Sequence, residues 1–231
     1  MKDMRLLVIH FLCLRLVACV SEEVAQWKKL DHKAYQLLTQ GEYEEGVVVA
    51  VQALDLAKKC FGPADPNVAI SLVRLAGFYK RQRKHSEAEP FLQRALVITE
   101  NARGPDHADV AMVLNNLGTL YKVQGKYSDA ELLLKRSLAI TEKTQGPEHP
   151  HTAATLSNLA TVYCAQGKYS EAEPLYKRSL AIFEKKLGPE HPNVAISLGE
   201  LAELYRKTAN EEEASKLEER AQNIKSRSGN R

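Results

Sequence analysis

The sequence predicts an all-α protein built from five helix–turn–helix repeats. The first observation is a Gly-Pro pair that recurs every 42 residues, at positions 62, 104, 146 and 188. The second is that each intervening segment carries two apolar stripes with helical spacing, joined by a short polar turn. A fixed internal period of this length is typical of hairpins that stack on their neighbours, so it takes precedence over local assignments.

The composition of the chain narrows the range of functions that it can have. Of its 231 residues, 44% are hydrophobic and 26% are charged, which is ordinary for a globular protein. The net charge of +3 argues against a nucleic-acid partner, because such proteins need a clustered basic face. The four cysteines (13, 19, 60 and 164) have neither CxxC nor zinc spacing, so we expect no metal.

The first 20 residues do not fit the repeat. Lys2 and Arg5 precede an apolar run from Leu6 to Leu14, and small residues follow it. This order is typical of a secretory signal peptide, and the run is shorter than the ~20 apolar residues of a membrane-spanning helix. We therefore predict a cleavable signal peptide over residues 1–18. The alternative is an apolar N-terminal helix that covers the first repeat.

The end of this segment, Leu16-Val17-Ala18-Cys19, resembles the lipobox of bacterial lipoproteins. In that family the peptide is cut before the cysteine, whose thiol carries the lipid. The resemblance implies lipidation at Cys19 and membrane anchoring through it. The expected location is therefore outside the cytoplasm, as a periplasmic, membrane-anchored or secreted protein. If residues 1–20 are not a signal, the expected location is the cytoplasm.

Five repeats follow in order. Repeat 4 is the clearest, because the stripe of its first helix lies at i, i+3, i+4 and i+7: Leu156, Leu159, Ala160 and Tyr163. Repeat 1 is degenerate and carries the only tryptophan, and repeat 5 is polar, as a terminal repeat must be. The predicted repeats span residues 24–60, 66–102, 108–144, 150–186 and 192–224, with a tail at 225–231.

Small residues recur where two helices must cross. The first helices carry them at Ala34, Ala76, Gly118, Ala160 and Ala202. The second helices carry alanine at 88, 130, 172 and 214, where repeat 1 has Gly46. A larger side chain would overpack such a crossing, so these positions predict a close approach. Tyrosines at 79, 121, 163 and 205 are expected to fill the space between neighbouring hairpins.

Glycine and histidine recur at the helix ends. Gly41, Gly125 and Gly167 are expected to supply the left-handed backbone of the turn inside a hairpin, where repeat 2 has Arg83. Histidines at 107, 149 and 191 and Asp65 precede the first helices, which predicts N-caps. Equivalent positions in stacked hairpins lie too far apart to share one metal ion, so we interpret these histidines as structural.

The pattern Leu-x-x-Leu-Ala/Gly-x-x-Tyr, followed by alanine in the second helix, resembles the tetratricopeptide repeat. The 42-residue spacing and the phrases LNNLGTLYKVQGKY, EAEPLYKRSLAI and GPEHPNVA resemble its kinesin light chain type. The resemblance covers about residues 24–224. It implies a solenoid that forms a right-handed superhelix, with first helices lining a concave groove. Such a groove binds an extended peptide or a partner helix.

The resemblance also implies which residues face that groove. The second Asn of the family's Leu-Asn-Asn-Leu matches Asn116 and Asn158, and its equivalents are His32, Arg74 and Glu200. The predicted groove residues are Arg74, Lys80, Arg81, Asn116, Thr119, Lys122, Asn158, Thr161 and Glu200. Asparagine amides suit an extended backbone, and the cations suit an acidic ligand. The alternatives are asparagines that bond neighbouring hairpins and cations that are merely solvated.

These features predict a non-catalytic scaffold that binds a protein or peptide. The alternative is a cytoplasmic adaptor like kinesin light chain, although residues 1–23 lack the heptads that such adaptors use. The chain has no GxSxG, GxxxxGK[ST] or HExxH motif, so we expect no catalytic residues and no cofactor.

Overall fold

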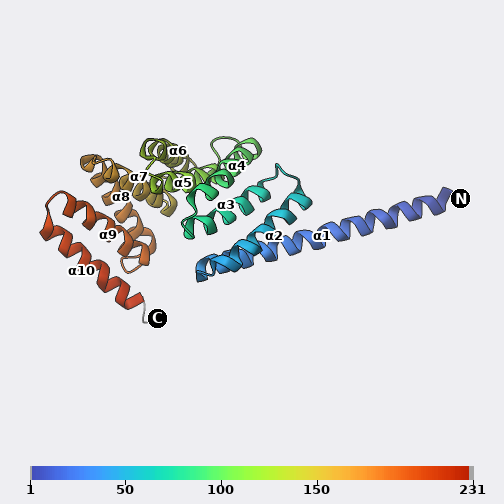
Figure 1. Cartoon of the computed structure of the whole chain (residues 1–231), viewed down its shortest axis with the longest axis horizontal. Helices are drawn as coiled ribbons and strands as arrows, with labels where there is room; N and C mark the ends of the chain where they lie inside the picture. Colours follow the sequence, from blue (N-terminus) through green and yellow to red (C-terminus); the bar gives the residue numbers. More distant parts are fainter. Residues whose placement is uncertain (1, 229–231) are drawn as a thin grey trace. The chain divides into compact units, whose positions relative to one another are not determined.

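A computed structural model describes the backbone of residues 2–228 and the side chains of residues 21–227. All regular secondary structure in this part of the chain is α-helical, which confirms the predicted fold class (Figure 1). The helices form two compact units, residues 1–104 and 105–231. Unit 1 contains α1 (Lys2–Gln40), α2 (Tyr43–Phe61), α3 (Pro66–Arg81) and α4 (His85–Arg103). Unit 2 contains α5 (Ala108–Val123), α6 (Tyr127–Gln145), α7 (Pro150–Ala165), α8 (Tyr169–Leu187), α9 (Pro192–Lys207) and α10 (Glu211–Ser228).

Helix α1 continues without a break through the predicted signal segment. Its N-terminal part projects past α2 (Figure 1), and the side chains of residues 1–20 lie outside what the structure describes. The lipidation of Cys19 and the cleavage after residue 18 therefore stay predictions. Among the described helices, none has both the length and the apolar character that crossing a bilayer requires.

The ends of the first helices follow from their sequence. Asp65 and the histidines at 107, 149 and 191 each accept a hydrogen bond from the backbone amide two residues on, at 2.8–3.2 Å. Proline occupies the first helical position after three of these caps, where its missing N–H costs nothing. The predicted capping role of the histidines is confirmed. The described residues include no cluster of three or more side chains suited to a metal ion.

The turn inside each hairpin needs a left-handed residue. Glycine supplies it at 41, 125 and 167, with φ between 76° and 84°. Arg83 adopts φ 61° at the equivalent position, and Ala209 adopts φ 59° in repeat 5. A side chain in this region costs roughly 1–2 kcal/mol. The turn geometry is therefore imposed by the packing of the two helices, even where the sequence does not favour it.

The hairpins are held together by crossings of small residues. Ala34, Ala76, Ala160 and Ala202 are fully buried, and so are the alanines at 88, 130, 172 and 214. At Gly118 an added Cβ would lie 2.7 Å from Leu134 Cγ, so α5 and α6 approach too closely there for any side chain. The crossings thus tolerate neither larger residues nor a change of register.

Gly46 shows that these crossings are matched in pairs. A Cβ at this position of α2 would lie 1.9 Å from Phe78 Cε1 of α3. In unit 2 the second helix carries alanine at this position and a smaller residue faces it, as in the pairs Ala130–Val162 and Ala172–Leu204. Glycine in repeat 1 therefore compensates for the larger phenylalanine on the next hairpin.

Polar contacts add to the stacking between hairpins in unit 2. The carboxylate of Glu131 on α6 contacts Lys168 of the next hairpin at 3.1 Å and Lys135 of its own helix at 2.6 Å, and these hydrogen bonds lower its pKa to about 2. The hydroxyl of Tyr205 donates to Glu173 at 3.1 Å. Tyr205 thus combines an apolar ring with a bonded hydroxyl at the junction between two hairpins.

The Gly46–Phe78 match predicts a double-mutant rescue. Gly46→Ala should lower the free energy of unfolding by about 1–3 kcal/mol, because the new methyl overpacks against Phe78. Adding Phe78→Leu should recover part of this loss, since it restores the alanine–leucine pair found in repeats 4 and 5. Urea denaturation of the single and double variants measures the coupling.

Gly199→Ala is the matched control, because a Cβ there meets nothing within 4 Å. It should stabilise the protein by up to about 1 kcal/mol through helix propensity. Additive effects of Gly46→Ala and Phe78→Leu would contradict the paired packing.

Candidate functional site

The face formed by the first helices of each unit carries the predicted groove residues. We call it the first-helix face: α1 and α3 in unit 1, and α5, α7 and α9 in unit 2. Helix α3 contacts α1, and α7 contacts both α5 and α9, so these helices lie side by side within their units. Each predicted residue can therefore be compared with its neighbour on the preceding first helix.

Arg74 is held within the protein. Its Nε and Nη2 donate to the two carboxylate oxygens of Asp31 on α1, at 3.2 and 2.8 Å. The guanidinium also lies over the ring of Tyr35, 5.1 Å from its centroid. Only 22% of the Arg74 side chain is exposed. This bidentate pair ties α3 to α1 and leaves little of the guanidinium for a ligand.

The same connection recurs twice in unit 2. Asn158 of α7 donates from Nδ2 to Asn115 Oδ1 of α5 at 3.0 Å. Ser157 of α7 donates from Oγ to the carboxylate of Glu200 on α9. In all three pairs the two residues are separated by 43 positions. We call these three pairs the rungs: Asp31–Arg74, Asn115–Asn158 and Ser157–Glu200.

The rungs account for three of the five residues at the predicted groove position, namely Arg74, Asn158 and Glu200. An arginine faces a carboxylate, an amide faces an amide, and a carboxylate faces a hydroxyl. Each residue thus fits its partner on the preceding hairpin. The structure supports, for Asn158, the alternative that the sequence leaves open, namely bonding to a neighbouring hairpin.

The remaining polar residues of unit 2 bond mostly within their own helix. Asn116 donates to the carbonyl of Met112 at 3.1 Å, and Thr119 donates to the carbonyl of Asn116 at 2.8 Å. Thr161 donates to the carbonyl of Ser157 at 2.9 Å and accepts from Tyr176 at 3.0 Å. Their hydroxyl and amide groups still line the face, with part of their hydrogen-bonding capacity used.

Lys122 and Glu200 influence each other across this face. Burial lowers the pKa of Lys122, and the charge of Glu200 opposes this shift. Burial raises the pKa of Glu200, while the Ser157 hydrogen bond and the charge of Lys122 oppose it. The two opposite charges therefore partly balance one another within unit 2, which reduces the attraction for an acidic ligand that was expected of Lys122.

The two other predicted cations belong to unit 1. Arg81 is exposed and has no ion pair or hydrogen bond with the residues that the structure describes. Lys80 is half-buried and makes polar contacts of its own. Arg81 alone therefore keeps the character of an available cation at the end of α3.

An apolar row that was not predicted lies beside the polar residues of unit 2, at Met112, Ala154 and Ile196, and Ile70 occupies the equivalent position in unit 1. Ile70, Met112 and Ile196 are large apolar residues with exposed fractions of 40%, 47% and 56%. They occupy the same repeat position, one helical turn before Arg74, Asn116 and Glu200, and Ala154 is the fourth member. Large exposed apolar side chains that recur on one face mark a binding surface. The signal was present in the sequence as a column of four apolar residues spaced 42 apart.

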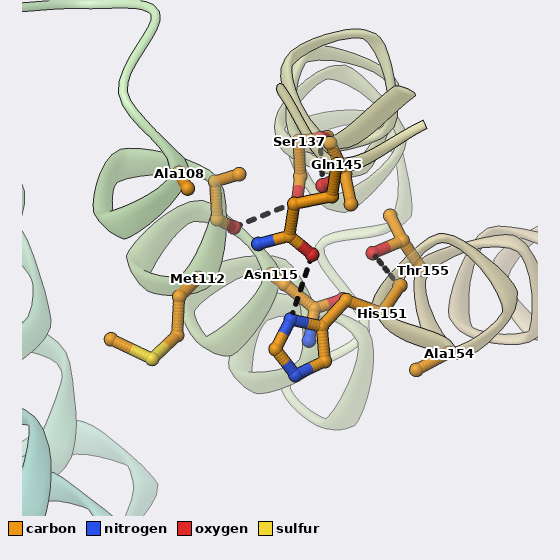
Figure 2. Close-up of a pocket in the computed structure, with 10 residues that line it drawn as sticks. Ala108, Met112, Asn115, Ser137, Gln145, His151, Ala154 and Thr155 are labelled. Atoms are coloured by element: carbon orange, nitrogen blue, oxygen red, sulfur yellow. Dashed lines mark hydrogen bonds between the residues drawn. The ribbon is translucent and has the colours of Figure 1, made fainter. Parts of the chain in front are cut away.

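A pocket of about 230 Å³ opens on the first-helix face of unit 2, between α5, α6 and α7. Figure 2 shows His151 and Gln145 meeting at its edge, where His151 Nδ1 lies 3.0 Å from Gln145 Oε1. The lining residues are Ala108, Ala111, Met112, Asn115, Ser137, Thr141, Gln145, His151, Ala154 and Thr155. The pocket thus joins the apolar row at Met112 and Ala154 to the rung residue Asn115.

Taken together, these features define a helical-hairpin repeat protein with an exposed apolar and polar face in each unit. The model of the tetratricopeptide repeat matches residues 28–96, 67–143, 133–185 and 151–227. The chain belongs to the tetratricopeptide repeat family. This fold is typical of protein-interaction scaffolds, and its members bind protein or peptide partners.

Solved structures contain the same kind of helical repeat. The TPR-like repeats of a kinesin light chain from Podosopora anserina share 27% identity, cover 89% of this chain and 97% of their own, and give a TM-score of 0.71. This similarity confirms the predicted likeness to kinesin light chain repeats. A search of the curated proteins returned no match.

Two further structures are similar in fold. BtubC (BKLC) from P. vanneervenii has 20% identity and a TM-score of 0.72, covering 93% of this chain and 91% of its own. PilF of Pseudomonas aeruginosa has 20% identity and a TM-score of 0.63, with coverage of 89% and 78%.

The rungs predict that Arg74 is needed for stability. Arg74→Ala should lower the free energy of unfolding by about 1–3 kcal/mol, because it leaves the Asp31 carboxylate without its partner. The exchange Asp31→Arg with Arg74→Asp should recover part of the loss by re-forming the pair. Thermal and urea denaturation measure both effects.

Arg81→Ala is the control, since Arg81 lies on the same helix and is exposed. It should change stability by no more than about 0.5 kcal/mol. Equal effects of Arg74→Ala and Arg81→Ala would show that the Asp31–Arg74 rung does not stabilise unit 1.

Proposed function

We propose that this chain is a non-catalytic scaffold that binds an extended segment of a partner protein along the first-helix face. The observation that carries the proposal is the exposed apolar row of unit 2, in which Met112 and Ile196 flank Ala154 beside the polar side chains of the same helices. An extended segment presents alternating side chains and a polar backbone, and a face with both kinds of contact suits it.

The balance of charge supports a partner segment that is largely neutral where it meets unit 2. Lys122 and Glu200 offset each other, and Glu203 pairs with Lys207 at 2.9 Å. The other polar groups are amides and hydroxyls, which bond to a backbone without the cost of desolvating a charge. Within unit 1, the exposed Arg81 would attract an acidic residue of a partner.

The non-catalytic part of the proposal rests on how the ionisable groups are used. Glu200 is hydrogen-bonded to Ser157, Arg74 to Asp31, and the histidines before the first helices to backbone amides. Each of these groups already serves stacking or capping. Catalysis would instead need an acid, base or nucleophile that is poised for a substrate.

Site-specific photocrosslinking tests the face. A photoreactive benzoylphenylalanine in place of Met112 should crosslink a partner in the native host, because Met112 lies in the apolar row. The matched control replaces Leu132, which is 69% exposed on the second helix α6 of the same unit. We expect at least fivefold more crosslinked partner from position 112. Equal yields from the two positions would contradict binding at the first-helix face.

We also propose that the protein is exported and anchored through a lipid on Cys19. The support is the basic start, the short apolar run and the Leu-Val-Ala-Cys segment of residues 1–19. One acyl chain anchors a protein only marginally, so this proposal requires either several chains on the cysteine or a membrane-bound partner. The alternative is a cytoplasmic adaptor like kinesin light chain, which would keep its N-terminal residues.

Cys19→Ala separates these two locations. The variant should lose metabolic labelling with a fatty-acid analogue and move from the membrane to the soluble fraction. Cys60→Ala, a cysteine in α2, is the control and should leave both unchanged. Labelling that persists in Cys19→Ala would refute the lipid, and an intact Met1 in the native protein would refute export.

A further inference from the structure

The positions that line this pocket of unit 2 recur at other hairpin junctions of the same chain, where different side chains occupy them. Because the period is 42, each lining residue has an equivalent at the junction of α7, α8 and α9. There Phe183 stands at the position of Thr141, and Leu187 at the position of Gln145. Phe183 is 5% exposed and packs with Ala153, Val194 and Leu198. At that junction the protein fills the space with its own aromatic ring.

Unit 1 fills the equivalent space in a different way. Trp27 of α1 stands at the position of Ala111, and Phe61 of α2 stands at the position of Gln145. The two rings meet edge to face with their centroids 5.1 Å apart, and Trp27 is only 6% exposed. The indole nitrogen donates to Ser71 Oγ at 3.1 Å. This junction also contains aromatic rings supplied by the protein.

The junction of α5, α6 and α7 is therefore the exception among the three that lie within one unit. Alanine, threonine and glutamine replace the tryptophan and phenylalanines that close the other two. The space that remains, about 230 Å³, exceeds the roughly 150 Å³ that suffices for a benzene ring in a protein interior.

The polar atoms of the pocket wall are largely used within the protein. Ser137 donates to the carbonyl of Ala111 and Thr141 to that of Ser137, both at 2.7 Å. Thr155 donates to the carbonyl of His151 at 3.0 Å. The threonines therefore offer their methyl groups to the cavity, beside the alanines at 108, 111 and 154. No lysine, arginine or carboxylate lines it, so an uncharged and mainly apolar group fits.

The edge of the pocket can bond to the backbone that carries such a group. Asn115 accepts from Asn158, which leaves its amide N–H groups as donors. The His151 ring bonds to Gln145 through Nδ1, which leaves Nε2 facing outward (Figure 2). These groups lie next to Met112, in the apolar row of the first-helix face.

We infer that this pocket binds one uncharged aromatic side chain of the partner segment, in place of the ring that the protein itself supplies at its other junctions. The inference rests on the proposed function in one respect, namely that the aromatic ring comes from a partner segment. The pocket itself is independent of that function, because it follows from the packing of three helices.

Filling the pocket tests the inference directly. Thr141→Phe copies Phe183, and should keep or raise the melting temperature while closing the cavity. The probe is 5-fluoroindole, followed by ¹⁹F NMR line broadening on the full-length chain. The wild type should bind the probe. The chemical shifts of the protein's backbone amides should then change only around residues 108, 111 and 154. Thr141→Phe should weaken binding at least tenfold.

Two other variants keep the result interpretable. Leu132→Phe places the same residue on the exposed face of α6 and should bind the probe like the wild type. Ala154→Ile copies Ile196 and narrows the pocket from α7, so it replaces Thr141→Phe if that variant fails to fold. Absence of probe binding in the wild type, or equal binding after the pocket is filled, would overturn the pocket.

A displayed library of random dodecapeptides tests the source of the ring. Selection on the wild type and on Leu132→Phe should enrich peptides with one fixed aromatic residue, and selection on Thr141→Phe should lose that preference. Binders without a shared aromatic residue would overturn the partner side chain. Crosslinking repeated with benzoylphenylalanine at Ile196, which belongs to the apolar row but does not line the pocket, reports the proposed function without the pocket. The probe 5-fluoroindole reports the pocket without a partner, so the two failures can be told apart.

Discussion

The close crossing of two helices at alanine or glycine is the constraint on which every hairpin of this protein depends. A helical hairpin of about 40 residues cannot bury a complete core by itself, so its two apolar faces must be covered by its neighbours. The small residues at 34, 76, 118, 160 and 202 let the two helices approach, and they thereby bring the larger leucines and tyrosines of each hairpin into reach of the next. At Gly118 there is no room even for a methyl group.

Once the spacing is fixed, variation at one position requires a matching change elsewhere. Gly46 accommodates Phe78, Asp31 binds Arg74, and Ser157 binds Glu200. When equivalent positions are compared along the sequence, each residue is considered on its own. In the structure, the side chain that fits at one position depends on its contact partner on the neighbouring hairpin. Differences between repeats therefore record stacking as well as ligand binding.

This pairing explains what could be predicted from the sequence and what could not. The helices and their caps depend on contacts within a few residues, such as His149 with the amide of His151. Their prediction needed only periodicity and local chemistry. The rungs join residues 43 positions apart, and which side chains meet depends on the rotation of one hairpin against the next. The pocket depends on the side-chain volumes of three helices at once, so no single sequence motif predicts it.

Comparison of equivalent junctions among the repeats also distinguishes a binding pocket from a packing defect. In a protein without repeats, a cavity of about 230 Å³ has no internal standard. Here the same junction occurs elsewhere in the chain, with Phe183 in one case and Trp27 with Phe61 in another. The chain can therefore close this space, and at Thr141 it leaves the space open next to the exposed Met112. An open space costs packing energy, so a ligand that fills it regains contacts that the other junctions already make. The face that holds the hairpins together and the face that meets a partner are, at this junction, the same surface.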